Sequence, residues 1–143
     1  MSSEEFDLER FATAQAQLID RVREELARGR KQTHWMWFVF PQIASLGFSA
    51  MSQRYAIRSL EEAKAYIAHP VLGTRLKECT ALVLAVKDRT IHDIFGSPDD
   101  MKFQSCMTLF SHAAPDAPEF RDALVKYFGG EEDAATLEIL DLT

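Results

Sequence analysis

The sequence lacks the features that mark metal-binding, redox, β-hairpin and membrane-spanning proteins. Its 143 residues include two cysteines, Cys79 and Cys106, which form no Cys-x-x-Cys motif, so metal and redox sites have no support. Asparagine is absent and no Asp-Gly pair occurs, which removes the strongest signal for β-hairpins. The longest apolar runs, 35–41 and 81–86, fall far short of the roughly 20 residues that span a bilayer.

Positive charge is also scarce. Lysine and arginine number 16 against 22 aspartates and glutamates, which gives a net charge of -6. Nucleic acids and anionic lipid surfaces both select basic proteins, so we expect neither as a partner. The N-terminal residues are acidic and carry no apolar signal core. We therefore expect a soluble, cytoplasmic protein, and no motif indicates a metal ion or a cofactor.

The apolar residues that are present follow helical spacing along most of the chain. Hydrophobic residues make up 47% of the sequence, which is typical of a globular chain that buries roughly 68–70% of its unfolded surface. We predict an all-α fold, a compact multihelical single domain (1–143) of about five to seven helices. The first helix is expected to contain Phe11 and Leu26 and to end at Gly29. Gly73, inside a later helix, indicates close packing.

Several helix starts carry side-chain signals. Ser59 and Glu62 have the spacing of a capping box, in which hydroxyl and carboxylate satisfy each other's backbone N–H groups. Thr90 and Asp133 are expected N-caps. Ser97 is expected to be another, because it precedes a proline suited to the first helical position.

The segment Thr33–Gln42 concentrates both tryptophans and two phenylalanines between a histidine and a glutamine. Its middle, 35–40, has high strand propensity, and 81–86 would be the pairing partner. A single pair of strands is marginal, and the sequence offers no third strand. Apolar side chains on every side favour a short buried helix over that strand.

The polar ends of this segment are the first candidate ligand-binding residues. His34 and Gln42 would face a cavity; the alternative is an exposed histidine and a glutamine bonded to a neighbouring loop. Trp37 could stack on a ligand, although a tryptophan more often belongs to a core, and an unpaired indole N–H beside a pocket would favour the ligand. Arg54 and Tyr55 could hold a phosphate or a carboxylate, or simply lie at the surface.

A second candidate set lies on the helix predicted to follow Pro98. Ser105, Thr108 and His112 share one narrow sector at 100° per residue, with Lys102 at its edge. Together these groups could bind phosphate through charge-assisted hydrogen bonds; the alternative is an ordinary solvated face. As a catalytic Ser–Lys pair the set is poor, because the order Ser-x-x-Lys is reversed.

Ordered blocks along nearly the whole chain resemble a bacterial family of small multihelical proteins of unknown function. The blocks are His34–Gln42, Ser52–Ile57, His69–Leu76 and Lys102–Phe110. The resemblance implies a compact helical domain and no particular activity. Some family members carry the label calpastatin. Calpastatin-type inhibitors are long, disordered and repetitive, whereas this chain is short and has no repeats, so we do not expect the label to describe its function.

Two functions remain open. The first is a helical domain, either an enzyme or a binding protein, that takes a small anionic, nucleotide-type ligand between 34–42 and the helix 102–112. The second is a non-enzymatic interaction domain, a homodimer or an adaptor, that uses the aromatic residues of the helix 120–128. The first is favoured, because Lys102 offers a place for an anion and no feature identifies a protein partner.

Overall fold

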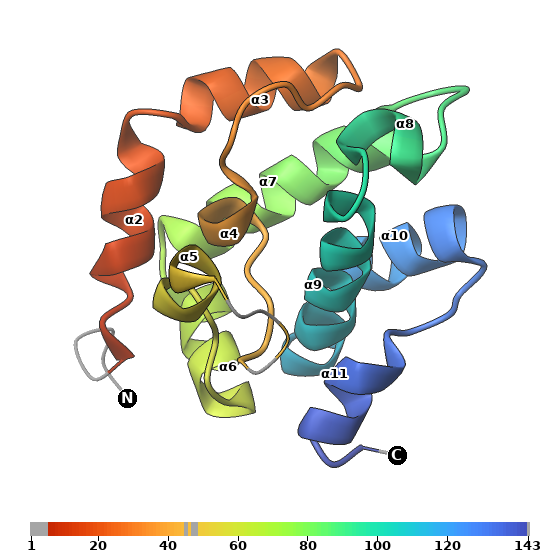
Figure 1. The fold of residues 1–143 in the computed structure, drawn as a ribbon. Coiled ribbons are helices and arrows are strands. Elements are labelled where there is room, and N and C mark those ends of the chain that lie inside the picture. Colours follow the sequence, from red (N-terminus) through yellow and green to blue (C-terminus); the bar gives the residue numbers. More distant parts are fainter. Residues whose placement is uncertain (1–5, 45, 47–48, 143) are drawn as a thin grey trace.

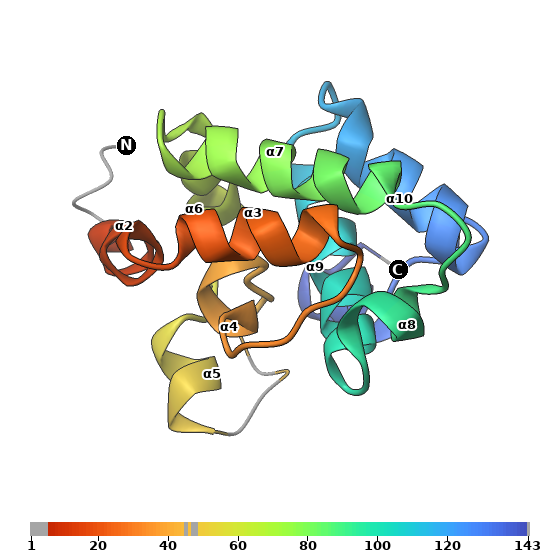
Figure 2. The ribbon, with the colours of Figure 1, turned by 90° about the horizontal axis from the view of Figure 1, so that it is seen from above.

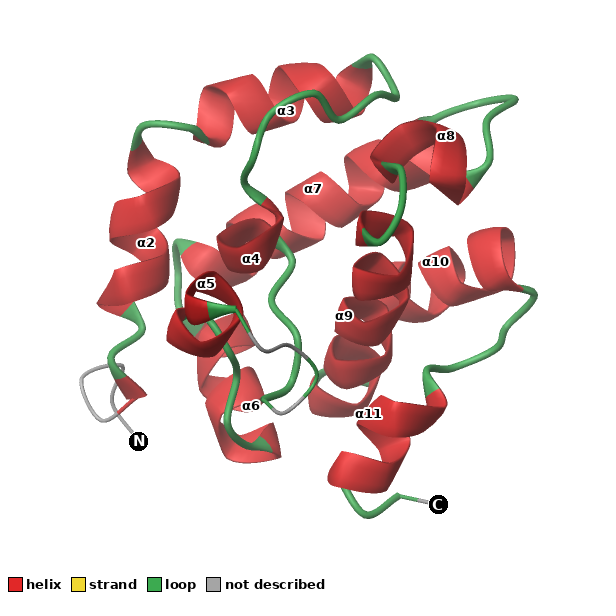
Figure 3. Cartoon of the chain, viewed as in Figure 1, coloured by secondary structure: helices red, strands yellow, loops and turns green. Residues whose placement is uncertain are grey.

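The computed structural model describes residues 6–44, 46 and 49–142. These residues form ten helices and no strand, which confirms the predicted all-α class (Figure 1; Figure 3). The number exceeds five to seven because one predicted helix is divided in two and because single-turn helices form after residue 35. The helices are α2 (Glu9–Ala16), α3 (Ile19–Ala27), α4 (Met36–Val39), α5 (Ala50–Arg54), α6 (Leu60–Ala68), α7 (Leu72–Ala85), α8 (Ile91–Phe95), α9 (Asp99–Ala113), α10 (Pro118–Phe128) and α11 (Ala134–Ile139).

The prediction of one continuous first helix is wrong. The chain turns between α2 and α3 at Gln17 and Leu18, although both residues keep backbone angles close to the helical region (φ -87° and ψ -16°, φ -110° and ψ -13°). No glycine or proline marks this turn, so the apolar spacing continues across it. The turn sets α2 and α3 at an angle (Figure 1), and Phe11 of α2 and Val22 of α3 are both buried.

The aromatic segment forms the short buried helix that the sequence favoured. Four residues of the segment, Met36–Val39, make up α4, and the flanking Trp35 and Phe40 are also buried. Within the helix only Trp37 is half-buried, so one side of α4 reaches the surface. The alternative strand pairing does not form, because residues 81–85 belong to α7.

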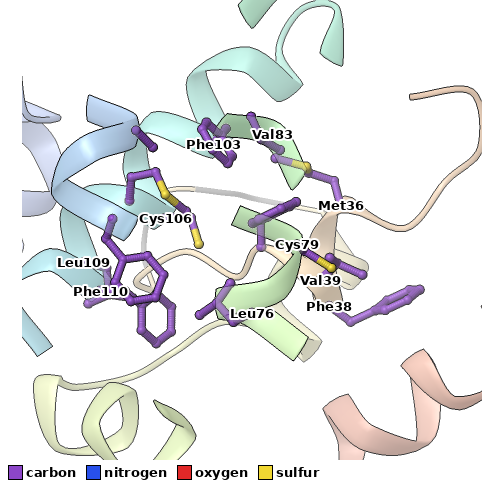
Figure 4. Packing of buried hydrophobic residues seen from close by; sticks show 14 of the residues in the cluster. Met36, Phe38, Val39, Leu76, Cys79, Val83, Phe103, Cys106, Leu109 and Phe110 are labelled. Atoms are coloured by element: carbon purple, nitrogen blue, oxygen red, sulfur yellow. The ribbon is translucent and has the colours of Figure 1, made fainter. Parts of the chain in front are cut away.

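Helix α9 lies in the middle of the molecule and packs against α6, α8, α10 and α11. Seen from above, α4 and α5 lie on one side of α9, and α7 and α10 lie on the other (Figure 2). Side chains from α4, α7 and α9 meet in the core, among them Met36, Cys79, Val83 and Phe103 (Figure 4). The surface side of α4 therefore faces away from a rigid packed core.

The local sequence signals account for most helix starts. Hydroxyl or carboxylate oxygens of Ser59, Thr90 and Asp133 each accept a backbone N–H in the first turn, at 3.0, 3.0 and 2.9 Å. Ser97 is not an N-cap, because α9 begins at Asp99 without a side-chain capping bond. The close packing predicted at Gly73 is confirmed, since an added Cβ would collide with a main-chain oxygen of α6.

The polar sector of α9 is covered by the C-terminal segment. Gln104 Nε2 donates to the Glu131 carbonyl at 3.0 Å, and Thr108 Oγ1 accepts the Asp133 N–H at 2.9 Å. His112 Nε2 lies 2.7 Å from a Glu132 carboxylate oxygen. Ser105 and Thr108 are buried, so this sector is not a solvated face; it positions α11.

Candidate functional site

A cavity of about 260 Å³ lies between the chain that continues α4 and the segment 52–58. An isolated parallel β-bridge joins the two walls: Ala44 N–H donates to the Ile57 carbonyl at 2.7 Å, and Ile57 N–H donates to the Gln42 carbonyl at 2.9 Å. Lys102 reaches the cavity from the first turns of α9. The lining residues are Met36, Trp37, Phe40, Gln42, Ile43, Ala44, Ser52, Gln53, Tyr55, Ala56, Arg58 and Lys102.

The α4 wall is anchored by the buried carboxylate of Glu25 in α3. It accepts hydrogen bonds from the main-chain N–H groups of Gln32 and Thr33 at 2.7 and 3.0 Å, from the Thr33 hydroxyl at 2.7 Å and from Trp35 Nε1 at 2.9 Å. Burial, the largest single influence, would raise the pKa of Glu25, but the four hydrogen bonds together lower it to about 2. The ionised carboxylate therefore fixes the residue that precedes α4.

The opposite wall is held by Arg10 of α2. Its guanidinium donates to the carbonyls of Arg54 and Ala56 at 2.8 and 2.9 Å and to the Glu62 carboxylate at 2.9 Å. The other oxygen of Glu62 accepts the Arg58 N–H at 3.1 Å. The predicted capping box is therefore only half formed. The Ser59 hydroxyl accepts the Glu62 N–H, but the Glu62 carboxylate bonds Arg58 and Arg10 in place of the Ser59 N–H. Arg10 thus ties α2, α6 and the 54–58 segment together.

Trp37 and Lys102 meet at the cavity. The Lys102 ammonium lies 5.5 Å from the centroid of the Trp37 ring, within the range of a cation–π interaction. Trp37 Nε1 bonds no described residue, whereas every buried side-chain nitrogen or oxygen in the described chain has a partner. The Trp37 indole N–H is therefore not a buried group, and Trp37 is one of the residues that line the cavity.

Lys102 is only loosely paired within the protein. Asp99 Oδ2 lies 2.9 Å from Lys31 Nζ, whereas Asp99 Oδ1 lies 3.6 Å from Lys102 Nζ. The Lys31 side chain is 9% exposed and that of Lys102 is 23% exposed. Asp99 therefore pairs mainly with the buried Lys31, and Lys102 keeps hydrogen-bond donors for an anion in the cavity.

A second cavity of about 320 Å³ adjoins the first and shares Gln42 and Lys102 with it. Ser105 lines this second cavity, and its hydroxyl donates to the Met101 carbonyl at 3.2 Å. Most of its other lining is apolar, and Asp133 contributes a carboxylate. The shared residues make the two cavities neighbouring compartments of one groove.

The structure brings together three of the six residues singled out in the sequence. Trp37, Gln42 and Lys102 line the first cavity, and Ser105 lines the second. Thr108 is buried against α11, and His34 is exposed and lines neither cavity. Helix α9 contributes only Lys102 to the first cavity. The segment 52–58 forms the wall opposite 34–42 that we had expected α9 to form.

Sequence reasoning missed Arg58 and undervalued Tyr55. Both line the first cavity, and Tyr55 is buried there. Arg58 follows Ile57, whose pairing with Ile43 joins two loop segments that carry no strand pattern. No local signal in the sequence marks this bridge, so nothing placed Arg58 opposite Trp37.

Comparison with known proteins agrees with this architecture. A family model described as "Protein of unknown function (DUF1810)" matches residues 5–140. The chain belongs to the DUF1810 family. A search of curated proteins finds no match.

A solved structure resembles the DUF1810 chain closely. It is the crystal structure of the conserved hypothetical protein Rv1873 from Mycobacterium tuberculosis, with 53% sequence identity and a TM-score of 0.95. The alignment covers 97% of this chain and 99% of that one. Neither the family description nor this structure assigns an activity.

The described part of this DUF1810 chain has no cluster of side chains placed to bind a metal ion, and both of its cysteines are buried. No group of three or more histidine, cysteine, aspartate or glutamate side chains there is placed to hold a metal ion. Cys79 and Cys106 are free and buried, and burial raises the pKa of Cys79 to about 12 and that of Cys106 well above its usual value. Both thiols are therefore protonated near neutral pH.

The aromatic residues of α10 pack mainly within this DUF1810 chain. Phe120 and Leu124 are buried, and Tyr127 donates its hydroxyl to the Val83 carbonyl at 2.5 Å. Val125 is the exposed apolar residue of the helix, at 56% exposure. Separately, none of the helices in the described ranges has the length and apolar character needed to cross a membrane.

Proposed function

We propose that this protein binds a small nucleotide-type anion in the cavity between Trp37, Arg58 and Lys102. The observation that carries the proposal is the Lys102 ammonium over the face of Trp37, whose indole N–H bonds no described residue. Such a pair offers a ligand an aromatic surface, a hydrogen-bond donor and a positive charge at one place.

The charge of the cavity supports an anionic ligand. Lys102 and Arg58 both line it, and its described lining includes no carboxylate. The chain as a whole carries a net charge of -6, so this local excess of positive charge is not a general property of the molecule. Charge-assisted hydrogen bonds from two cations favour a phosphate or carboxylate group there.

The rest of the lining supports a flat, partly apolar ligand body. Met36, Phe40 and Tyr55 present apolar and aromatic surface, and the Gln42 amide can pair with the edge of a heteroaromatic ring. The first cavity alone, about 260 Å³, lies just below the roughly 300–1,000 Å³ typical of ligand sites. The adjoining compartment extends the groove enough for a nucleotide-sized molecule.

The proposal concerns binding within one cytoplasmic domain. The buried apolar side chains form one cluster from Leu8 to Leu124, which supports a single domain. Two free, buried thiols agree with a reducing compartment. The interaction-domain alternative loses its motivation, because the aromatic residues of α10 that suggested it contact the core of their own chain.

A thermal-shift screen of the purified protein against nucleotides, sugar phosphates and carboxylates tests the proposal. A ligand present at 100 times its dissociation constant stabilises the folded state by about 2.7 kcal/mol. We expect a shift with nucleotides that Lys102→Gln and Trp37→Phe each remove. Lys77→Gln, at an exposed position of α7 outside the cavities, is the matched control and should keep it. Equal shifts in Lys102→Gln, Trp37→Phe and the control would refute the proposed site.

A further inference from the structure

A third cavity continues the groove on the side of Arg58. It has a volume of about 270 Å³ and is lined by Asp7, Arg10, Arg54 and Arg58. Arg58 lines both this cavity and the Trp37 cavity, so the two adjoin at its side chain. Three arginines facing one space, with a single carboxylate, give this end of the groove a positive character.

The three arginines differ in what they can offer a ligand. Each guanidinium N–H of Arg10 already has an acceptor, because Nη1 also donates to the carbonyls of Phe6 and Asp7 at 2.6 and 2.8 Å. Arg10 is therefore a structural residue. The guanidinium groups of Arg54 and Arg58 form no hydrogen bond or ion pair with any described residue.

Both free guanidinium groups extend from a backbone that is held in place. The Arg54 carbonyl accepts Arg10 Nε, and the Arg58 N–H is bound by the Glu62 carboxylate. The Arg54 guanidinium also lies 5.5 Å from the ring centroid of Tyr55, which lines the Trp37 cavity. A fixed backbone lowers the entropy lost when these side chains close on an anion.

From this arrangement we infer that the ligand carries an extended polyphosphate-type chain, which runs from Lys102 past Arg58 to Arg54. This inference rests on the proposed function where it places the ring of the ligand in the Trp37 cavity. The placement of the phosphate chain along the three cations does not depend on that proposal. Lys102 and Arg58 share one cavity, and Arg58 and Arg54 share the next. A compact group with one phosphorus centre would contact one end of this row, whereas contact with all three cations would need linked phosphates.

Calorimetric titration of the whole protein, without divalent cations, tests the inference. The probes are adenosine monophosphate, adenosine triphosphate, inorganic orthophosphate and inorganic tripolyphosphate. The variant is Arg54→Gln, and the matched control is Arg30→Gln at an exposed position outside the groove. We expect the triphosphate to bind at least about tenfold more tightly than the monophosphate, and tripolyphosphate to bind more tightly than orthophosphate. Arg54→Gln should reduce both differences, because it removes one of the three cations and keeps Lys102 and Arg58.

The outcomes separate this inference from the proposed function. Equal affinities for the adenosine mono- and triphosphates in the unaltered protein would contradict the extended chain and leave the nucleotide site in place. A second outcome would support the chain site and refute the ring site. In it, Arg54→Gln weakens tripolyphosphate binding, adenosine monophosphate does not bind, and adenosine triphosphate binds no more tightly than tripolyphosphate. If tripolyphosphate does not bind, or Arg54→Gln and Arg30→Gln weaken it equally, the inference is wrong.

Discussion

The Lys102 ammonium lies 5.5 Å from the ring centroid of Trp37, although the two residues belong to different helices that are far apart in the sequence. Trp37 projects from α4, which Glu25 anchors through Trp35. Lys102 projects from α9, next to an aspartate that pairs mainly with Lys31. Polar contacts at Glu25 and at Asp99 therefore hold the segments from which the two side chains project.

Lys102 should matter for binding and little for stability. Lys102→Gln removes a partly exposed side chain with one loose ion pair, so we expect the free energy of unfolding to change by less than about 1 kcal/mol. Nucleotide affinity should fall at least about tenfold. His34→Ala is a useful comparison, because His34 is exposed outside both cavities and its loss should leave affinity unchanged. Urea denaturation and calorimetric titration of both variants measure these effects.

Glu25 should make stability depend on acid pH. Its pKa falls from 4.5 in the unfolded chain to about 2 in the folded protein, so its stabilising contribution is complete above pH 4.5 and is lost as the pH falls toward 2. The shift corresponds to about 3 kcal/mol. Glu25→Gln should lose a similar amount at pH 7, and its stability should decline less between pH 5 and pH 2. Parallel stability curves for both proteins over this range would show that the carboxylate does not act in this way.

Arg10 should be essential for the folded state. Arg10→Ala removes the Arg10 donors to one oxygen of the buried Glu62 carboxylate and to four main-chain carbonyls, and we expect a loss of about 3–5 kcal/mol. Glu62→Gln, which keeps a polar group facing Arg10, should lose less. Chemical denaturation measures both. A loss below about 1 kcal/mol in Arg10→Ala would contradict the tie between α2 and the 54–58 segment.

Thr108 should hold α11 and take no part in binding. Thr108→Val removes the acceptor of the Asp133 N–H, and we expect a loss of about 1–3 kcal/mol and faster amide exchange throughout α11. Thr108→Ser keeps the hydroxyl and is the matched control. Unchanged exchange in Thr108→Val would mean that α11 is held by other contacts of the C-terminal segment, such as those of Gln104 and His112.

Short-range patterns predicted the parts of this fold that depend on neighbouring residues. The caps at Ser59, Thr90 and Asp133 each form the expected bond, since donor and acceptor lie within three residues of each other. The burial of α4 follows from apolar side chains on all of its sides. The ligand-binding role of Trp37 stays a prediction, which the lining of the cavity by this residue supports.

Long-range contacts decided the rest. Glu62 bonds Arg10 rather than completing its capping box, because the guanidinium arrives from a different helix. Thr108 lies on the polar sector of α9, but it is buried because α11 returns to cover it. Arg58 joins the candidate site through the bridge between Ile43 and Ile57 and the contacts of Glu62 and Arg10. Periodicity and propensity are silent on such pairings, since each depends on where another segment lies in space.

The most direct test of the proposed site uses the two indole N–H resonances in a proton–nitrogen correlation spectrum, assigned with Trp37→Phe. Trp35 Nε1 is bonded to the buried Glu25 and serves as an internal control, whereas Trp37 Nε1 bonds no described residue and belongs to a side chain that lines the cavity. On addition of adenosine triphosphate we predict a saturable shift of the Trp37 resonance, no comparable shift of Trp35, and loss of the effect in Lys102→Gln. A Trp37 resonance that stays fixed while the nucleotide binds elsewhere, or that shifts equally in Lys102→Gln, would contradict the Trp37–Lys102 site.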